Sequence, residues 1–256
     1  MHNLALPHHP LTFWITASLA MIILGMDKAG FGGGIGFVAT PLMALTISVP
    51  DAAALLLPLL MIADVISLRH YYGVFDRQSI RVLLPGAILG TFAAGLVFNY
   101  FSDNERILKI GLGILVLLFI TFQLVRALIF GALGKRRFPA SLGFLLGTGA
   151  GFTSTLVHAG SPFANIYLLP QEMPRELFIG TTVLLYALMN WIKLIPYAWL
   201  GLLRIGNLTT VLLLAPLTYV GIRLGLHCKH YFSDKWFNRL VYALLFLTGL
   251  QLIWKA

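Results

Sequence analysis

The stretch GMDKAGFGGGIGFVATPL, Gly25 to Leu42, decides how this chain folds. Five glycines fall within seven of its residues, namely Gly30, Gly32, Gly33, Gly34 and Gly36. Each glycine costs an α-helix about 1 kcal/mol relative to alanine, so an unbroken helix is not expected here. The flanking residues are apolar enough to lie in a membrane, where unwound backbone is tolerated only if protein buries it or it lines a cavity. The stretch therefore predicts two half-helices whose junction lines a cavity.

The composition predicts an integral membrane protein of the polytopic α-helical class. The 256 residues are 59% hydrophobic and only 11% charged, whereas a soluble domain is about a quarter charged. Runs such as Leu177 to Trp191 are apolar on every face, as helices in lipid are, and do not alternate as barrel strands do. The lysines and arginines behind the net charge of +9 cluster between these runs, which indicates membrane orientation and no nucleic-acid partner.

Two halves of the chain resemble each other. YFSD occurs at Tyr100 to Asp103 and again at Tyr231 to Asp234, an offset of 131 that also carries Pro85 onto Pro216. The tripeptide AGF at 29–31 recurs at 150–152. We therefore expect a single transmembrane transport domain over residues 1–256, built from tandem repeats at about 11–126 and 140–256.

Each expected repeat contains four hydrophobic units. They are Leu11 to Val49, Ala52 to Leu68, Ile80 to Val97 and Ile107 to Val125, then Leu142 to Leu169, Leu177 to Leu194, Leu208 to Leu226 and Leu240 to Ile253. The first unit of each repeat is longer than the roughly 20 residues that one crossing needs, and glycine and proline interrupt both. We expect each first unit to consist of two half-helices that enter and leave on the same side.

The distribution of basic residues favours this topology. If all eight units crossed simply, the 17 lysines and arginines outside the opening motif would divide ten to seven between the two sides. If both first units turn back, they divide twelve to five, which agrees better with the excess of basic residues in cytoplasmic loops. Each repeat then crosses three times, so the two repeats are inverted and both termini are extracellular.

The two expected breaks are candidate anion sites. Exposed amide N–H groups and the positive end of a half-helix suit a bound anion. The break in the second repeat is HAGSP, His158 to Pro162, which adds the hydroxyl of Ser161. In the first repeat, Asp27 and Lys28 adjoin the glycines; either Lys28 supplies positive charge to an anion, or both residues lie at an aqueous mouth.

Polar residues inside apolar helices are further candidates, because burying them in a membrane is costly. Asn190 and Lys193 share one helix face. Asp64 and Ser67 have the same spacing in the first repeat, and each lies 126 residues before its counterpart. Lys193 either binds substrate or extends to the membrane surface. Asp64 carries a coupling proton or pairs with a basic residue, and His158 either titrates near neutral pH or is structural.

Motifs of other functions are weak or missing. Gly34, Gly36 and Ala39 fit a dinucleotide-binding pattern without its strand-turn-helix context, and Phe31 stands where a P-loop needs lysine. Gly86-x3-Gly90 and Gly221-x3-Gly225 are more typical of close helix packing. The single cysteine, Cys228, gives no disulfide and no cysteine metal cluster, and we expect no metal site and no cofactor.

The chain resembles the sulfite exporter TauE/SafE family. The resemblance rests on AGFGGG followed by Pro41, on the GSP of the second break, on LLPGAILG and on RELFIGTTVLLYALMNWIKLIPYAWLG, and it covers nearly the whole chain. It implies a multi-pass protein of the bacterial inner membrane that exports small sulfur-containing or organic anions. The substrate region it implies comprises Gly32, Gly33, Gly34, Pro41, Gly160, Ser161, Pro162, Thr181, Thr182, Asn190 and Lys193.

The function hypothesis is a secondary transporter that exports a small anion, most of all a sulfur oxyanion such as sulfite or an organosulfonate. Its partners are the anion and the lipid bilayer, and the sequence does not indicate an oligomeric state. A passive anion channel is the nearest alternative. An intramembrane enzyme or assembly factor is disfavoured, because no Ser-His-Asp set and no H-E-x-x-H motif is present.

Overall fold

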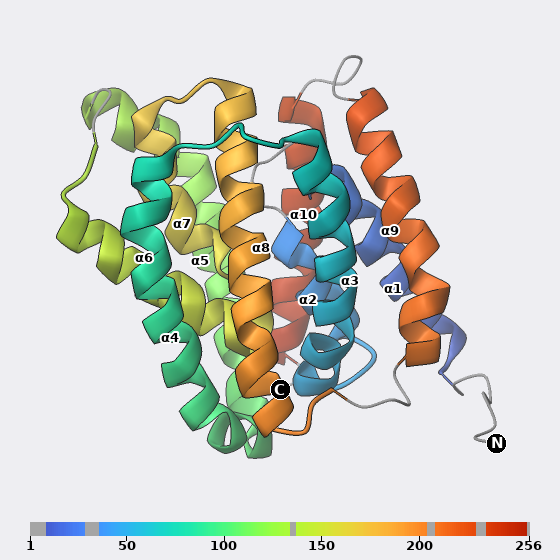
Figure 1. Ribbon diagram of the computed structural model, residues 1–256. Coiled ribbons are helices and arrows are strands. Elements are labelled where there is room, and N and C mark those ends of the chain that lie inside the picture. Colours follow the sequence, from blue (N-terminus) through green and yellow to red (C-terminus); the bar gives the residue numbers. More distant parts are fainter. Residues whose placement is uncertain (1–8, 29–35, 134–136, 204–207, 229–233, 255–256) are drawn as a thin grey trace.

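The protein is helical throughout the part that its computed structural model describes, which comprises residues 9–28, 36–133, 137–203, 208–228 and 234–254. Figure 1 shows the helices side by side in one bundle. In chain order the elements are α1 (Leu11–Met26), the 3-10 turn η2 (Gly36–Val38), α2 (Ala39–Met43), α3 (Val49–His70), α4 (Arg77–Asp103), α5 (Glu105–Leu133), α6 (Ala140–Val157), α7 (Ser161–Leu168), the 3-10 turn η3 (Leu169–Gln171), α8 (Arg175–Trp199), α9 (Leu208–Cys228) and α10 (Asp234–Trp254).

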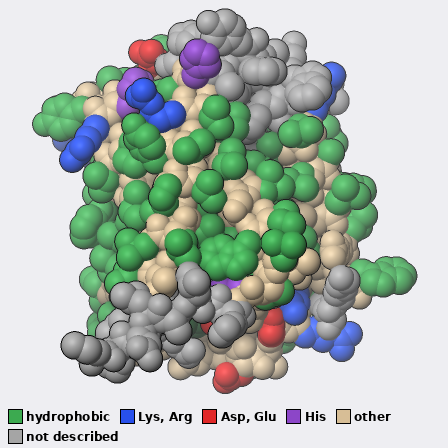
Figure 2. Space-filling view, turned by 90° about the vertical axis from the view of Figure 1, so that its right-hand side faces the viewer, with side chains coloured by type: hydrophobic (Ala, Val, Ile, Leu, Met, Phe, Trp, Pro, Cys, Tyr) green, Lys and Arg blue, Asp and Glu red, His purple; other side chains and the backbone are tan. Residues whose placement is uncertain are grey.

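Six helices in the described residues are long and apolar enough to cross a membrane. They are Val49–His70, Arg77–Asp103, Glu105–Val125, Ala140–Val157, Arg175–Trp199 and Leu208–His227. Figure 2 shows hydrophobic side chains over the middle of one face, with charged side chains gathered toward its two ends. The polytopic helical membrane class predicted from the composition is confirmed.

The helices begin where local chemistry satisfies their first N–H groups. At the start of α3, Ser48 accepts a hydrogen bond from the backbone N–H of Asp51, and Pro50 occupies the first turn, where no N–H donor is needed. At the start of α4, the carboxylate of Asp76 accepts a hydrogen bond from the N–H of Ser79. The Asp76 cap ends the short connection between α3 and α4, which run antiparallel.

The long helices alternate in direction (Figure 1). In that view α3 and α5 run upward and α4 runs downward, whereas α8 and α10 run downward and α9 runs upward. The start of α1 and the end of α10 both lie toward the lower end. In this view α3, α4 and α5 therefore run opposite to α8, α9 and α10, respectively.

Glycines let two pairs of helices pack at short range. Gly86 and Gly90 of α4 face the backbone of α6, and a Cβ atom at either position would overlap the carbonyl oxygen of Phe144 or Thr148. Gly221 and Gly225 of α9 face the backbone of α1 in the same way. Small residues at such contacts bring helix backbones together in lipid, which is the packing role expected from their spacing.

Both long first units are interrupted, and their interruptions position the site. Helix α1 ends at Met26, and the chain resumes in η2 and α2 before α3 begins. Helix α6 ends at Val157, and α7 begins at Ser161. The glycines Gly32, Gly33 and Gly34 lie outside the described residues.

Candidate functional site

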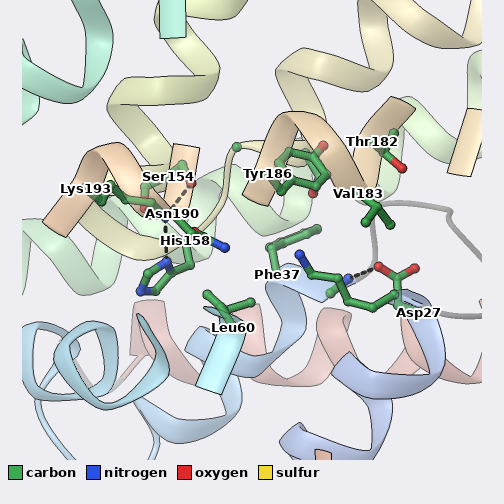
Figure 3. A pocket seen from close by; sticks show the side chains of 14 residues that line it. Asp27, Phe37, Leu60, Ser154, His158, Thr182, Val183, Tyr186, Asn190 and Lys193 are labelled. Atoms are coloured by element: carbon green, nitrogen blue, oxygen red, sulfur yellow. Dashed lines mark hydrogen bonds between the residues drawn. The ribbon is translucent and has the colours of Figure 1, made fainter. Parts of the chain in front are cut away.

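A small cavity of about 50 Å³ lies where the two interruptions face α8. Figure 3 shows the side chains that surround it. The lining comprises Asp27, Lys28, Gly36, Phe37, Leu60, Ser154, His158, Gly160, Ser161, Thr182, Val183, Tyr186, Asn190 and Lys193.

A hydrogen bond to a side chain joins the two ends of the first interruption. The carboxylate of Asp27, just after α1, accepts a hydrogen bond of 2.8 Å from the backbone N–H of Gly36. This bond joins the two ends of the glycine stretch and holds Gly36 and Phe37 at the cavity wall. A glycine suits this position because a Cβ at Gly36 would lie 3.0 Å from the same carboxylate oxygen.

Lys28 forms a buried ion pair with Asp64 of α3. The other carboxylate oxygen of Asp64 accepts a hydrogen bond of 2.6 Å from the side-chain amide of Asn190 on α8. Asp64 is 0% exposed and does not itself line the cavity. Of the two roles open to Asp64 from the sequence, the structure places it in a pair with a basic residue, and the charge of Lys28 is compensated there.

The second interruption turns the chain sharply between two helices. His158, after the last residue of α6, adopts a left-handed conformation with φ of 54°, and its N–H donates to the carbonyl of Ser154. Helix α7 then starts at Ser161 with Pro162 in its first turn. The turn brings the end of α6 and the start of α7 to the same wall of the cavity.

Lys193 is held at this second wall and is 0% exposed, so it does not extend to the membrane surface. Its ammonium group donates to the carbonyl of Ser154 (3.2 Å) and to the Ser154 hydroxyl (2.9 Å), and it lies 3.0 Å from Nδ1 of His158. Among the described residues, no carboxylate oxygen lies within 4 Å of it. The hydrogen-bond partners of Lys193 among the described residues are therefore all uncharged groups.

The contacts of His158 indicate which tautomer it holds. Its Nε2 lies 2.9 Å from the carbonyl of Ala53, an acceptor, so Nε2 carries the proton. Its Nδ1 then has a lone pair that accepts the hydrogen bond from Lys193. A neutral His158 adds no charge beside Lys193, so His158 orients the lysine in this arrangement.

Helix α8 presents one polar stripe to the cavity. Thr182, Tyr186, Asn190 and Lys193 follow each other at intervals of three or four residues and all line it. The sequence interpretation included three of these residues and missed Tyr186, although its position four residues before Asn190 was a usable signal. It also missed Ser154, which lies four residues before His158 on the same side of the break.

Three of the expected substrate residues are not brought to the cavity. Pro41 is buried within α2, and Pro162 occupies the first turn of α7. The hydroxyl of Thr181 accepts a hydrogen bond of 2.8 Å from the N–H of Asp76 and donates to the carbonyl of Leu177. Thr181 therefore joins the α3–α4 connection to α8, away from the cavity lining.

The connection that Thr181 supports carries a charged cluster at the end of the bundle. Arg137 contacts both Asp76, at 3.3 Å, and Gln78. Partial burial raises the pKa of Asp76, but the hydrogen bonds from Ser79 and the charge of Arg137 outweigh it, so its pKa lies below the ordinary value. Asp76 is therefore ionised at neutral pH and caps α4 as a carboxylate.

A helical membrane protein in which two interrupted helices surround a buried charged cavity has the architecture of a secondary transporter. The chain belongs to the sulfite exporter TauE/SafE family, whose model matches residues 17–252. This confirms the resemblance found in the sequence and identifies a membrane transporter, with sulfur-containing anions implied, and not an enzyme. Searches of curated proteins and of solved structures find no match to this chain.

Proposed function

We propose that the protein is a secondary transporter that exports a small anion, a sulfur oxyanion such as sulfite or an organosulfonate. The observation that carries this proposal is Lys193, a fully buried lysine at the cavity wall whose described hydrogen-bond partners are all uncharged. A buried charge without a counter-charge is costly, and an anion in the cavity offsets that cost. Asp27 also lines the cavity, but Figure 3 shows it on the opposite side from Lys193.

The anion is bound between Lys193 and the start of α7. Ser161 begins this helix at the cavity wall, and its position at the N-terminus places the positive end of the helix dipole beside the anion. Thr182 lines the same cavity from α8. Lys28 stays paired with Asp64, so in this proposal it shapes the wall and is not the main counter-charge.

The proposal includes an architecture of two inverted repeats, and the helix packing supports it. In the correspondence expected from the sequence, α1 matches α6, and α3, α4 and α5 match α8, α9 and α10. The contacts between helices follow this correspondence. Helix α4 packs on α6, and its counterpart α9 packs on α1, the counterpart of α6. Helix α3 packs on its own counterpart α8, and α5 packs on its own counterpart α10. Such an arrangement permits alternating access around one site.

We assign the end of the bundle with the α3–α4 connection to the cytoplasm. The described basic residues toward this end are Arg69, Arg77, Arg81, Arg137, Arg175, Arg223 and Arg239, whereas Arg106 and Lys109 start α5 at the other end. Lys193 is buried and belongs to neither surface. An excess of basic residues marks cytoplasmic loops.

This assignment predicts the accessibility of two exposed positions. On a Cys228→Ser background, we expect Tyr72→Cys to react with a membrane-impermeant maleimide only in inverted membrane vesicles, because Tyr72 is 90% exposed beside the α3–α4 connection. Asp103→Cys, at the other end of α4, is the matched control and is expected to react in intact cells. A reporter fused after Ala256 that is active only in the cytoplasm would contradict the topology.

Export also fits the energetics of a bacterial inner membrane. An anion leaving a cell with a negative interior gains about 2.3 kcal/mol per charge per 100 mV of membrane potential. The membrane potential alone is therefore enough to drive export of the anion, and the transporter needs no coupling ion.

Flux in proteoliposomes tests the function. We expect sulfite efflux to saturate with concentration and to accelerate when sulfite is added on the opposite side, because a carrier binds its substrate in each cycle. Sulfate, thiosulfate, sulfoacetate and organic carboxylates, added as competitors, define the substrate class. Large currents that do not saturate would identify a channel, and the absence of flux for every anion of the panel would overturn the proposal.

A further inference from the structure

Tyr186 carries a buried hydroxyl that none of the described residues satisfies. Its oxygen is shielded from solvent, and no hydrogen-bond partner for it lies in the part of the chain that the structure describes. Leaving a buried hydroxyl without a partner is unfavourable. Tyr186 nevertheless lines the cavity.

The neighbours of Tyr186 place it in the anion site. It lies on the α8 stripe between Thr182 and Asn190, and Figure 3 shows it between these two residues beside the cavity. The ammonium group of Lys28 lies 5.5 Å from the centre of its ring. A cation at this distance is attracted to the face of the ring, which leaves the phenol O–H at the ring edge as a hydrogen-bond donor.

A second buried tyrosine on the same helix shows the contrasting case. Tyr197 is 0% exposed, and its hydroxyl donates a hydrogen bond of 2.7 Å to the carbonyl of Thr155. It does not line the cavity. The hydroxyl of Tyr197, which has a structural role, thus has a partner in the protein.

We infer that the hydroxyl of Tyr186 donates a hydrogen bond to the transported anion and is a binding residue alongside Lys193. This inference rests on the proposed function. A hydrogen bond to a charged group contributes enough to change an affinity by about ten- to a hundredfold. Tyr186 therefore affects affinity for the anion and contributes little to folding.

The test compares Tyr186→Phe with Tyr197→Phe in the full-length purified protein, with sulfite and methanesulfonate as probes. For Tyr186→Phe we expect Kd to rise about tenfold or more while Tm stays equal or increases, because an unsatisfied hydroxyl is removed. For Tyr197→Phe we expect Tm to fall and Kd to stay within about twofold, because only a structural hydrogen bond is lost.

The outcomes separate this inference from the proposed function. A higher Kd for Tyr186→Phe without a fall in Tm supports the inference. An unchanged Kd, or a higher Kd that comes with a fall in Tm like that of Tyr197→Phe, overturns it and leaves the transporter proposal intact. If the unmodified protein binds neither these probes nor any anion of the flux panel, the proposed function fails and the inference fails with it.

Discussion

Replacing Lys193 by alanine is expected to lower anion flux by about two orders of magnitude or more. The substitution removes the buried cation that compensates the charge of the anion, together with a charge-assisted hydrogen bond, which contributes about 1.5 to 3 kcal/mol by itself. The groups that Lys193 contacts, Ser154 and His158, are uncharged in the arrangement described, so no unpaired charge is left behind. The protein should therefore remain folded while transport is lost.

The measurement is sulfite efflux from proteoliposomes that contain equal amounts of folded protein, checked by size-exclusion chromatography. Lys109→Ala is the matched control, because Lys109 lies on the surface of α5, where it pairs with Glu105 at 3.1 Å. We expect this variant to keep its flux within about twofold. Full transport by Lys193→Ala would show that Lys193 does not bind the anion, and the proposed function would lose its main support.

Replacing Asp64 by asparagine is expected to have the largest effect on stability. The change leaves the ammonium group of Lys28 buried without a counter-charge, and breaking a buried ion pair in this way costs about 3 to 5 kcal/mol. The double variant Lys28→Met/Asp64→Asn should recover most of this loss, because it removes both charges and the new side chain still accepts the hydrogen bond from Asn190.

The free energy of unfolding in mixed micelles measures both variants. Glu105→Gln is the control, since it breaks an exposed pair one helical turn apart and should change stability by less than about 1 kcal/mol. If Asp64→Asn and the unmodified protein had equal free energies of unfolding, the ion pair between Lys28 and Asp64 would not stabilise the fold, and the prediction would be wrong.

The sequence predicted the elements of the site better than their contacts. The break at HAGSP was expected from glycine and proline, and it occurs between Val157 and Ser161. The face shared by Asn190 and Lys193 followed from helical periodicity, and both residues line the cavity. The partners of Asp64 could not be predicted, because they come from the end of α1 and from α8, and the register between helices depends on packing.

Lys193 illustrates why local sequence was insufficient. The apolar run was expected to end at Leu194, which made an extended lysine at the membrane surface plausible. Helix α8 instead continues through Pro196 to Trp199, so Lys193 lies well inside the helix. A proline in a membrane helix is tolerated when neighbouring groups satisfy the backbone, and that depends on the surrounding helices.

The sequence by itself determined the membrane class, the family, the positions of both interruptions and most of the polar residues of α8, because composition, glycine content and helical period act within one segment. Only the tertiary structure decided that Lys28 forms an ion pair with Asp64. It also decided that, among the described residues, Lys193 has only uncharged hydrogen-bond partners and the hydroxyl of Tyr186 has none. The reason is physical, since the charge state of a site depends on which side chains from distant segments come within hydrogen-bonding distance.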